Sequence, residues 1–174
     1  MHAVATAPSA GERLKTLRAA RNQMLVGAAI GTGMTAQAAE RGGADLLLAL
    51  NAGRFRSMGV PSIASMLALR PCNDFVLDFA RAEILPRVAI PVFFGASAFD
   101  PALDITALVA RIAAAGFPGV VNFPTAALVD GRYRDFLEES GCGFAREVAL
   151  LTAARKAGLA TLAYVRTAAE AART

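Results

Sequence analysis

Histidine is almost absent from this sequence, in which the only one is His2, close to the N-terminus. Catalytic triads and catalytic zinc sites generally need a histidine inside the fold, so the sequence argues against both. Tryptophan is missing, there are only two tyrosines, and the net charge of +4 comes mainly from arginines scattered along the chain. Nucleic-acid surfaces need clustered basic side chains and aromatic rings for stacking, so we predict no nucleic-acid partner.

Cysteine and long apolar runs are scarce as well. Cys72 and Cys142 lie far apart without metal-type spacing, which predicts reduced thiols in the cytoplasm rather than a disulfide framework. Cys142 stands between two glycines, and without a histidine partner a small loop residue is favoured over a nucleophile. The chain has no signal-peptide core and no apolar run fit to span a membrane. We therefore predict a cytoplasmic protein without membrane contact.

Apolar residues, in contrast, make up 55% of the 174 residues, which is enough for one domain with a substantial core. Short, nearly continuous apolar runs alternate with helical segments, as in parallel sheets that are buried on both faces. This rhythm predicts an α/β fold of parallel βα repeats. The expected strands are residues 25–29, 46–50, 92–94, 120–123 and 161–165.

Capping signals mark the expected helices. Ser9 and Glu12 form a capping box, which predicts an N-terminal helix at about residues 10–21. Asp104 caps a helix at 105–115, and Asn73 or Asp74 caps one that reaches Leu85. The remaining helices are expected at residues 35–41, 62–69 and 144–157.

Five strands are fewer than the eight of a closed TIM barrel. A further capping box, Thr167 to Glu170, begins a helix shortly before the last residue, Thr174. We therefore expect residues 1–174 to form a single, partial TIM-barrel domain and the sequence to be incomplete. Unpaired edge strands would favour association between copies, so a homo-oligomer is expected.

In parallel α/β folds, ligands bind beyond the carboxyl ends of the strands. The first expected strand is followed by Gly31-Thr32-Gly33, which fits either an anion-binding nest or a tight turn with positive φ. The second is followed by NAGRFR, in which Asn51 leaves the strand and Gly53 allows close backbone approach. Arg54 and Arg56 offer guanidinium groups to an anion, although a solvated surface loop fits this stretch equally well.

The third and fourth strands also end in polar residues. GASAFDP follows the third strand and supplies Ser97 and Asp100, and this Asp could hold Mg²⁺ through water or begin a turn. NFPT follows the fourth strand and supplies Asn122 and Thr125. The adjacent acids Glu138 and Glu139 favour a solvated helix face, because neighbouring side chains on a helix point in different directions.

Taken in order, these motifs resemble the phosphoenolpyruvate hydrolase-like family of TIM-barrel proteins. The same domain is found in the C-terminal part of plant Tm-1-type virus-resistance proteins. The resemblance covers about Val26 to Val165. The segments that carry it are GAAIGTGMTAQAAERGGADLLLALNAGRFR, PVFFGASAFDP, GVVNFPTAALVDGRYRDFLEESGCGF and EVALLTAARKAGLATLAYV.

The resemblance implies a barrel of the phosphoenolpyruvate/pyruvate type that acts on a small anionic keto or enol acid, often phosphorylated. Asn51 and Asn122 would then polarise an oxygen as enolate charge develops, and Asp100 would help to place Mg²⁺. No nucleotide cofactor is expected. The alternatives are a non-catalytic ligand-binding or interaction domain derived from such a barrel, or an inactive fragment. The implied substrate-binding residues are Thr32, Gly33, Gly53, Arg54, Ser97 and Thr125.

Overall fold

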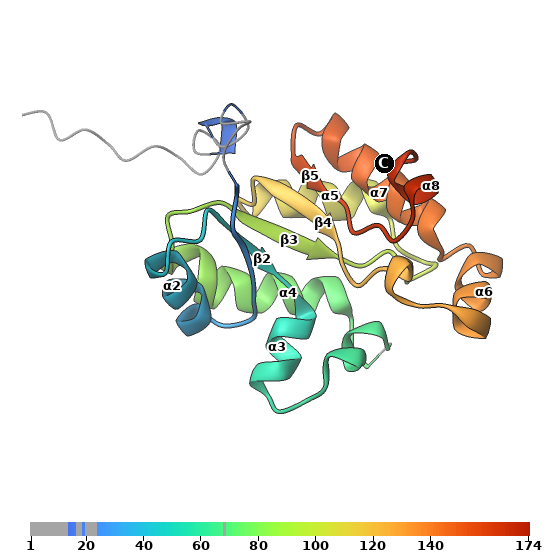
Figure 1. Ribbon diagram of the computed structural model, residues 1–174, viewed down its shortest axis with the longest axis horizontal. Coiled ribbons are helices and arrows are strands. Elements are labelled where there is room, and N and C mark those ends of the chain that lie inside the picture. The colour runs from blue at the N-terminus through green and yellow to red at the C-terminus, as the bar shows by residue number, and fades with distance from the viewer. Residues whose placement is uncertain (1–13, 17–18, 20–23, 68) are drawn as a thin grey trace, which may run out of the picture.

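A single parallel sheet forms the centre of the computed structural model, which describes residues 14–16, 19, 24–67 and 69–174 (Figure 1). Its strands lie in sequence order, and every neighbouring pair is parallel. The expected α/β fold with five parallel strands is confirmed. Among the described residues the sheet is open, because β1 and β5 pair with one strand each. The strands are β1 (Gly27–Ile30), β2 (Leu46–Ala49), β3 (Val92–Ala96), β4 (Gly119–Asn122) and β5 (Ala160–Leu162).

The register brings the carboxyl ends of the strands to one edge of the sheet. Ile30 pairs with Ala49 and Ala96 pairs with Asn122, each at or next to the end of its strand. Asn51, Asp100 and Asn122 therefore follow or end strands at the same edge, as the strand positions in the sequence predict. We call this side of the molecule the carboxyl edge.

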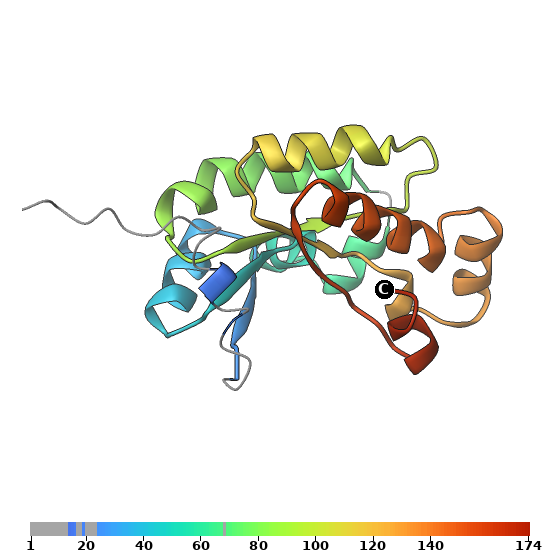
Figure 2. The same cartoon turned by 90° about the horizontal axis from the view of Figure 1, so that it is seen from above.

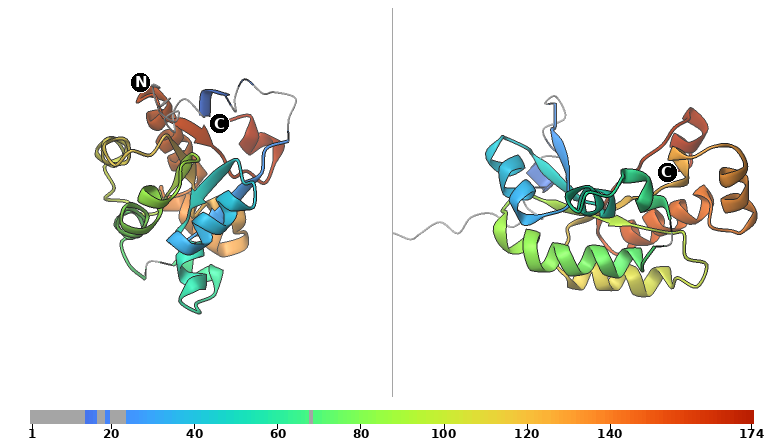
Figure 3. Two further views of the ribbon diagram at one scale, coloured as in Figure 1. Left: turned by 90° about the vertical axis from the view of Figure 1, so that its left-hand side faces the viewer. Right: turned by 90° about the horizontal axis from the view of Figure 1, so that it is seen from below.

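Four longer helices cover one face of the sheet: α2 (Gly33–Arg41), α4 (Cys72–Phe79), α5 (Ile105–Ala114) and α7 (Phe144–Lys156). Figures 2 and 3 show α4 and α5 side by side along this face. The main core lies between these helices and the strands, because every second strand residue points towards the helices. The strand residues buried in this core are Ile30, Leu47, Ala49, Val92, Phe94, Ala96 and Val120.

The opposite face of the sheet carries a second, smaller apolar cluster. It contains Leu46, Leu50, Phe93 and Val121, and Leu14 packs against it. The helix expected at about 10–21 lies mostly outside the described residues, but residues 14–16, which are described, are helical. This cluster occupies the face that would line the interior of a closed barrel.

Two capping predictions are confirmed and one is wrong. Asp104 accepts a hydrogen bond from Ala107 N at 3.0 Å, and the Thr167 capping box begins α8 (Ala168–Ala171). Neither Asn73 nor Asp74 caps α4, which instead begins directly after Pro71. The Asn73 side chain pairs with the backbone of Ser97, so a contact with the residue that follows β3 replaces the expected cap. The chain continues from α4 through the π-turn η2 (Ala80–Ile84) and the 3₁₀ turn η3 (Leu85–Arg87).

Other elements differ from the sequence-based expectation. NAGRFR is the helix α3 (Asn51–Ser57) rather than a loop, and residues 62–66 form the 3₁₀ helix η1 (Ser62–Met66). A glycine and a length of under two turns hide the periodicity of α3 in the sequence. The segment after β4 contains the turn η4 (Ala126–Leu128) and the helix α6 (Gly131–Glu139).

Within the described ranges, every helix is too short or too polar for a membrane span.

Candidate functional site

A buried polar cluster lies at the carboxyl end of β4. Asn122 ends the strand, Thr125 follows it, and Glu147 comes from the first turn of α7; all three are buried. Glu147 Oε2 accepts hydrogen bonds from Asn122 Nδ2 and Thr125 Oγ1, both at 2.6 Å. Glu147 Oε1 accepts one from Ala126 N at 2.7 Å. These three donors offset the cost of burying a carboxylate.

Burial raises the pKa of Glu147 to about 7, although the hydrogen bonds of the cluster and the charge of Arg134 act to lower it. Glu147 is not among the site residues predicted from the sequence. The sequence does contain a signal for it, because it shares one buried stripe of α7 with Phe144, Leu151 and Ala154. A charged residue in an apolar stripe of a helix indicates a buried polar contact.

The Asn122 side chain also continues the pairing between β4 and β5. Its Oδ1 accepts a hydrogen bond from Tyr164 N at 2.7 Å, and its Nδ2 donates to Tyr164 O at 3.1 Å. The last backbone pair of these strands is Val121 with Leu162. The amide thus replaces a backbone peptide group beyond the end of the ladder, which explains why a polar residue stands where an apolar strand ends.

Arg134 of α6 connects this loop to the last helix. Its guanidinium donates to Ala126 O and forms ion pairs with Glu138 Oε1 at 2.8 Å and with Glu170 Oε1 at 3.0 Å. Burial acts to raise the pKa of Glu170, but hydrogen bonds from Arg166 N, Arg134 and Thr167 N outweigh it and lower that pKa. The loop after β4, α6 and α8 therefore form one connected polar network.

Asn51 occupies a similar buried position after β2. Its Nδ2 donates to Ser65 O at 3.2 Å and lies 3.1 Å from Cys72 Sγ, while its Oδ1 accepts from Ala52 N. Both N–H groups of the amide are thus engaged in holding η1 and α4. Burial raises the pKa of Cys72 to about 12, against a hydrogen bond with Ser97, so this thiol stays protonated around neutral pH.

Arg54 lies in a fork-to-fork ion pair with Glu83 of η2. The distances are 2.9 Å from Nη1 to Oε2 and 2.8 Å from Nη2 to Oε1. An anionic ligand would have to share this guanidinium with a carboxylate that is already bound. The substrate-binding role of Arg54 stays a prediction.

The Gly31-Thr32-Gly33 segment begins α2, where Thr32 caps the helix through Thr35. Neither glycine has positive φ, so the turn interpretation that required it is wrong. A Cβ atom at Gly31 would overlap the backbone of Gly53 and Arg54, and one at Gly33 would overlap Glu83 O. Gly31 thus allows the end of β1 to approach α3, and Gly33 allows α2 to approach η2.

The loop after β3 contains the remaining predicted site residues. Ser97 is buried, and its Oγ accepts a hydrogen bond from Phe99 N at 3.3 Å. Asp100 is exposed, and its Oδ1 accepts from Ala102 N at 2.8 Å, which is the turn contact that the sequence offered as an alternative. Nowhere in the described part of the chain do three histidine, cysteine or acidic side chains gather to hold a metal ion. Among the described residues, the surroundings of Asp100 therefore do not form a metal centre of the protein's own.

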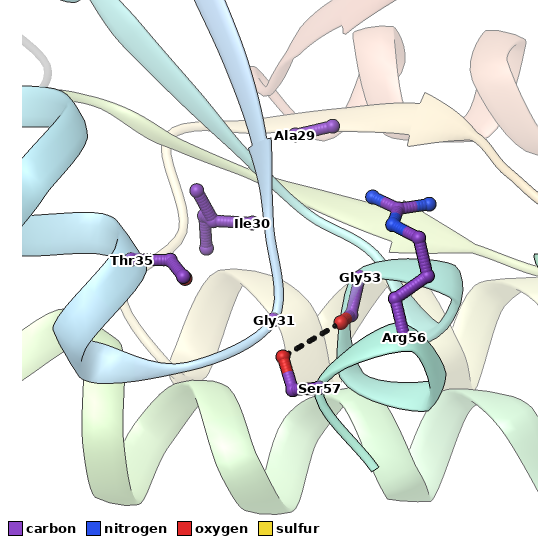
Figure 4. Close-up of a pocket in the computed structure, with 7 residues that line it drawn as sticks. All are labelled: Ala29, Ile30, Gly31, Thr35, Gly53, Arg56 and Ser57. Atoms are coloured by element: carbon purple, nitrogen blue, oxygen red, sulfur yellow. Dashed lines mark hydrogen bonds between the residues drawn. The ribbon is translucent and has the colours of Figure 1, made fainter. Parts of the chain in front are cut away.

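A pocket of about 340 Å³ opens at the carboxyl end of β1 (Figure 4). We call it the Arg56 pocket, after the arginine of α3 whose side chain borders it. Arg56 is exposed, and its Nη1 donates to Ser62 Oγ at 3.0 Å. Ser57 Oγ donates to Gly53 O at 3.0 Å. The lining residues are Ala29, Ile30, Gly31, Thr35, Gly53, Arg56 and Ser57.

The predicted site residues thus fall into separate groups along the carboxyl edge. Asn122 and Thr125 meet at Glu147, and Gly53 meets the backbone of Gly31 at the Arg56 pocket. Thr32 and Gly33 start α2, and Asn51 and Ser97 both contact Cys72. Of the two arginines in NAGRFR, Arg56 lines the Arg56 pocket and Arg54 is not among its lining residues. The sequence offered both arginines, and no feature of it indicated which one pairs with Glu83.

Comparison with known sequences identifies the family. Residues 11–174 match the phosphoenolpyruvate hydrolase-like family. The chain belongs to this family. It is 66% identical over 163 residues to the Sinorhizobium fredii protein named "Putative transcriptional regulatory protein y4pA" and 40% identical over 145 residues to the Solanum lycopersicum ToMV resistance protein Tm-1(GCR237). The alignments cover 92% and 83% of this chain, but only 27% of y4pA and 19% of the Tm-1 protein.

Solved structures support the fold of this phosphoenolpyruvate hydrolase-like chain. A 2,3-dimethylmalate lyase of the PEP mutase/isocitrate lyase superfamily superposes with a TM-score of 0.64 and 16% identity, covering 96% of this chain and 58% of the lyase chain. Phosphonopyruvate hydrolase in complex with oxalate and Mg²⁺ superposes with a TM-score of 0.57 and 21% identity, covering 92% of this chain and 64% of the hydrolase chain. At these identities the likeness shows the fold alone, which is that of the phosphoenolpyruvate/pyruvate TIM barrels.

Proposed function

We propose that this chain binds a small anionic keto or enol acid in the Arg56 pocket. The observation that carries the proposal is the partly free guanidinium of Arg56, which borders a pocket at the carboxyl edge. Guanidinium groups pair with carboxylates and phosphates through parallel hydrogen bonds. The pocket volume of about 340 Å³ lies at the small end of the range for ligand sites, which fits a small acid.

The family and its structural relatives support the proposed ligand class. Phosphonopyruvate hydrolase has been solved with oxalate, a small dicarboxylate, and with Mg²⁺. In this chain the carboxylate or phosphate of such an acid would pair with Arg56. The hydroxyl of Ser57 and the glycine backbones of the pocket would supply uncharged contacts.

Hydrolysis of such an acid is the second candidate function, and family membership favours it. The catalytic role expected of Asn51 and Asn122 requires N–H groups that can turn towards a developing oxyanion. Both amides already donate to protein acceptors, so catalysis would require these contacts to be given up. Ligand binding requires no such rearrangement, and a binding domain also suits a longer protein that is named for transcriptional regulation.

Calorimetric titration with oxalate and with phosphoenolpyruvate tests the proposal. We expect Arg56→Gln to weaken binding by roughly tenfold, which corresponds to about 1.4 kcal/mol. Arg155→Gln is the matched control, because this exposed arginine of α7 lies outside the pocket and its loss changes the net charge equally. Binding that is absent, or that Arg56→Gln and Arg155→Gln weaken equally, would contradict the proposal. Release of phosphate or pyruvate by the unmodified chain would support the second candidate.

A further inference from the structure

The first turn of α7 holds two strand-end loops through adjacent side chains of opposite charge. Arg146 Nη2 donates to the backbone carbonyls of Asp100, Pro101 and Leu103 in the loop after β3. Glu147 accepts hydrogen bonds from the loop after β4. An arginine stays charged at any ordinary pH, whereas a carboxyl group can gain a proton. The two loops therefore differ in how they can respond to pH.

We propose that Glu147 is the positioning residue of the loop formed by residues 122–127, and that a proton gained by its carboxyl group changes the conformation of this loop. The inference does not depend on the ligand proposed for the Arg56 pocket. It rests on which residues donate hydrogen bonds to the Glu147 carboxylate. The carboxylate receives them from Asn122, which ends β4 at the start of this segment, and from Thr125 and Ala126, which follow it.

The ionised carboxylate and the protonated carboxyl group require different hydrogen bonds. When ionised, Glu147 Oε2 accepts from both Asn122 Nδ2 and Thr125 Oγ1. A proton from solvent on Oε2 makes it a donor, and Thr125 can respond because a hydroxyl group both donates and accepts. Asn122 Nδ2 can only donate, so its remaining acceptor is Tyr164 O at 3.1 Å, because Thr125 Oγ1 accepts from Ala127 N at 3.1 Å and would now accept from Glu147 as well. Thr125 Oγ1 then accepts from Glu147 instead of donating to it, its own hydrogen turns away from the carboxyl group, and Asn122 loses its shortest acceptor contact.

The surroundings favour this response around neutral pH. Burial raises the pKa of Glu147 to about 7. Burial also raises the pKa of Tyr164, and hydrogen bonds hold the pKa of Glu170 below its ordinary value, so neither group changes charge in this range. Arg134 contributes a constant positive charge. Charged and titratable groups near the cluster include Arg134, Glu138, Arg146, Tyr164, Arg166 and Glu170, together with Asp130, which lies 3.4 Å from Arg166.

Nuclear magnetic resonance of the whole chain tests the inference directly, because its mass of 18.0 kDa is suitable for residue-resolved spectra. The backbone amide of Ala126 and the side-chain amide of Asn122 both donate to Glu147. We expect both signals to follow one titration curve with a midpoint near 7. The amide of Ala102, in the loop held by Arg146, is the internal reference and should stay constant across that range. Signals from Ala126 and Asn122 that do not titrate between about pH 5.5 and 8.5 would overturn the inference.

Variants assign the titration to this carboxyl group. Glu147→Gln should abolish it, whereas Glu139→Gln, at an exposed position of α6, should leave it unchanged. Because Glu147→Gln also removes an acceptor from the core, Thr125 provides an independent pair. Thr125→Val removes a donor that favours the ionised form and should raise the midpoint, while Thr125→Ser keeps the hydroxyl and should not. An equal midpoint in all three forms of residue 125 would overturn the inference.

Discussion

Arg54 and Glu83 form a fork-to-fork ion pair that joins α3 to η2, although the two residues are 29 positions apart in the sequence. The Phe79 ring lies 5.6 Å from the guanidinium carbon. The exposed fractions of the two charged side chains are 26% and 34%, so water screens the pair only in part. The geometry assigns Arg54 a structural contact in addition to any contact it makes with a ligand.

Replacement of this arginine should therefore lower stability. We expect Arg54→Ala to decrease the free energy of unfolding by about 1 to 2 kcal/mol, because Glu83 loses its partner and the Phe79 contact is lost. Arg155→Ala, at an exposed position on α7, should change it by less than about 0.5 kcal/mol. Urea denaturation measures both values. An Arg54→Ala chain with unchanged stability and lost affinity for oxalate would instead support the anion clamp expected from the sequence.

The buried carboxyl group of Glu147 should make stability depend on pH. Its pKa is raised from 4.5 to about 7, so the folded chain binds this proton more tightly than the unfolded chain. The contribution of Glu147 to the free energy of unfolding is fully present below about pH 4.5 and falls by a few kcal/mol as the pH rises to about 7. Denaturation at several pH values should show this fall in the unmodified chain but not in Glu147→Gln.

Glu170 should act in the opposite sense and in a more acidic range. Its pKa is lowered in the folded chain, so its contribution to the free energy of unfolding is present above its unfolded pKa and is lost as the pH falls through the folded value.

A difference curve between the unmodified chain and Glu147→Gln isolates the Glu147 contribution, because Glu170 is present in both. A difference that stays constant from about pH 4.5 to 7 would show that Glu147 is not perturbed.

Asn122 should be more important for stability than a residue at a strand end usually is. We expect Asn122→Ala to cost about 2 to 5 kcal/mol, because it leaves Glu147 with one donor fewer and the backbone of Tyr164 without its side-chain partner. Asn73→Ala is the comparison, since its amide pairs in the same way with Ser97 but is only half buried. Its cost should be clearly smaller. Equal losses in thermal denaturation would contradict the role assigned to Glu147.

The parallel strands could be predicted because their apolar runs are short, nearly continuous and separated by helix caps such as Asp104. Their register then determines that Asn51 and Asn122 lie at one edge. What the amides contact there could not be predicted. The partners of Asn122 are 25 and 42 positions away, and a pairing of this kind is a consequence of the tertiary fold.

The two arginines of NAGRFR show a second limit of the sequence. Arg54 and Arg56 are two positions apart on α3, so they point in different directions once the segment is helical. Read as a loop, the segment offers both as equal anion ligands. The helix turns Arg54 towards Glu83 and leaves Arg56 at the pocket. Treating the segment as a loop therefore hid the difference in position between the two arginines.

Self-association through the open sheet is a further expectation. Leu162 of β5 is 37% exposed, and among the described residues β5 pairs with β4 alone. Charged residues on edge strands prevent pairing between copies. We therefore expect Leu162→Lys to weaken association and so to lower the weight-average sedimentation coefficient of the chain. Phe136→Lys is the control, because Phe136 is 63% exposed but lies on α6. If only Phe136→Lys reduced association, the contact would involve α6 rather than the edge.

The proposed ligand site is tested most directly by mapping the backbone amides whose resonances shift when oxalate is added to the chain. Binding in the Arg56 pocket predicts that the shifts concentrate at Gly31, Gly53, Arg56 and Ser57, and that Arg56→Gln largely removes them. Amides at the opposite ends of the strands, such as those of Gly43 and Gly116, should not move. Saturating oxalate that shifts no amide of the pocket, or shifts only amides elsewhere, would contradict the account.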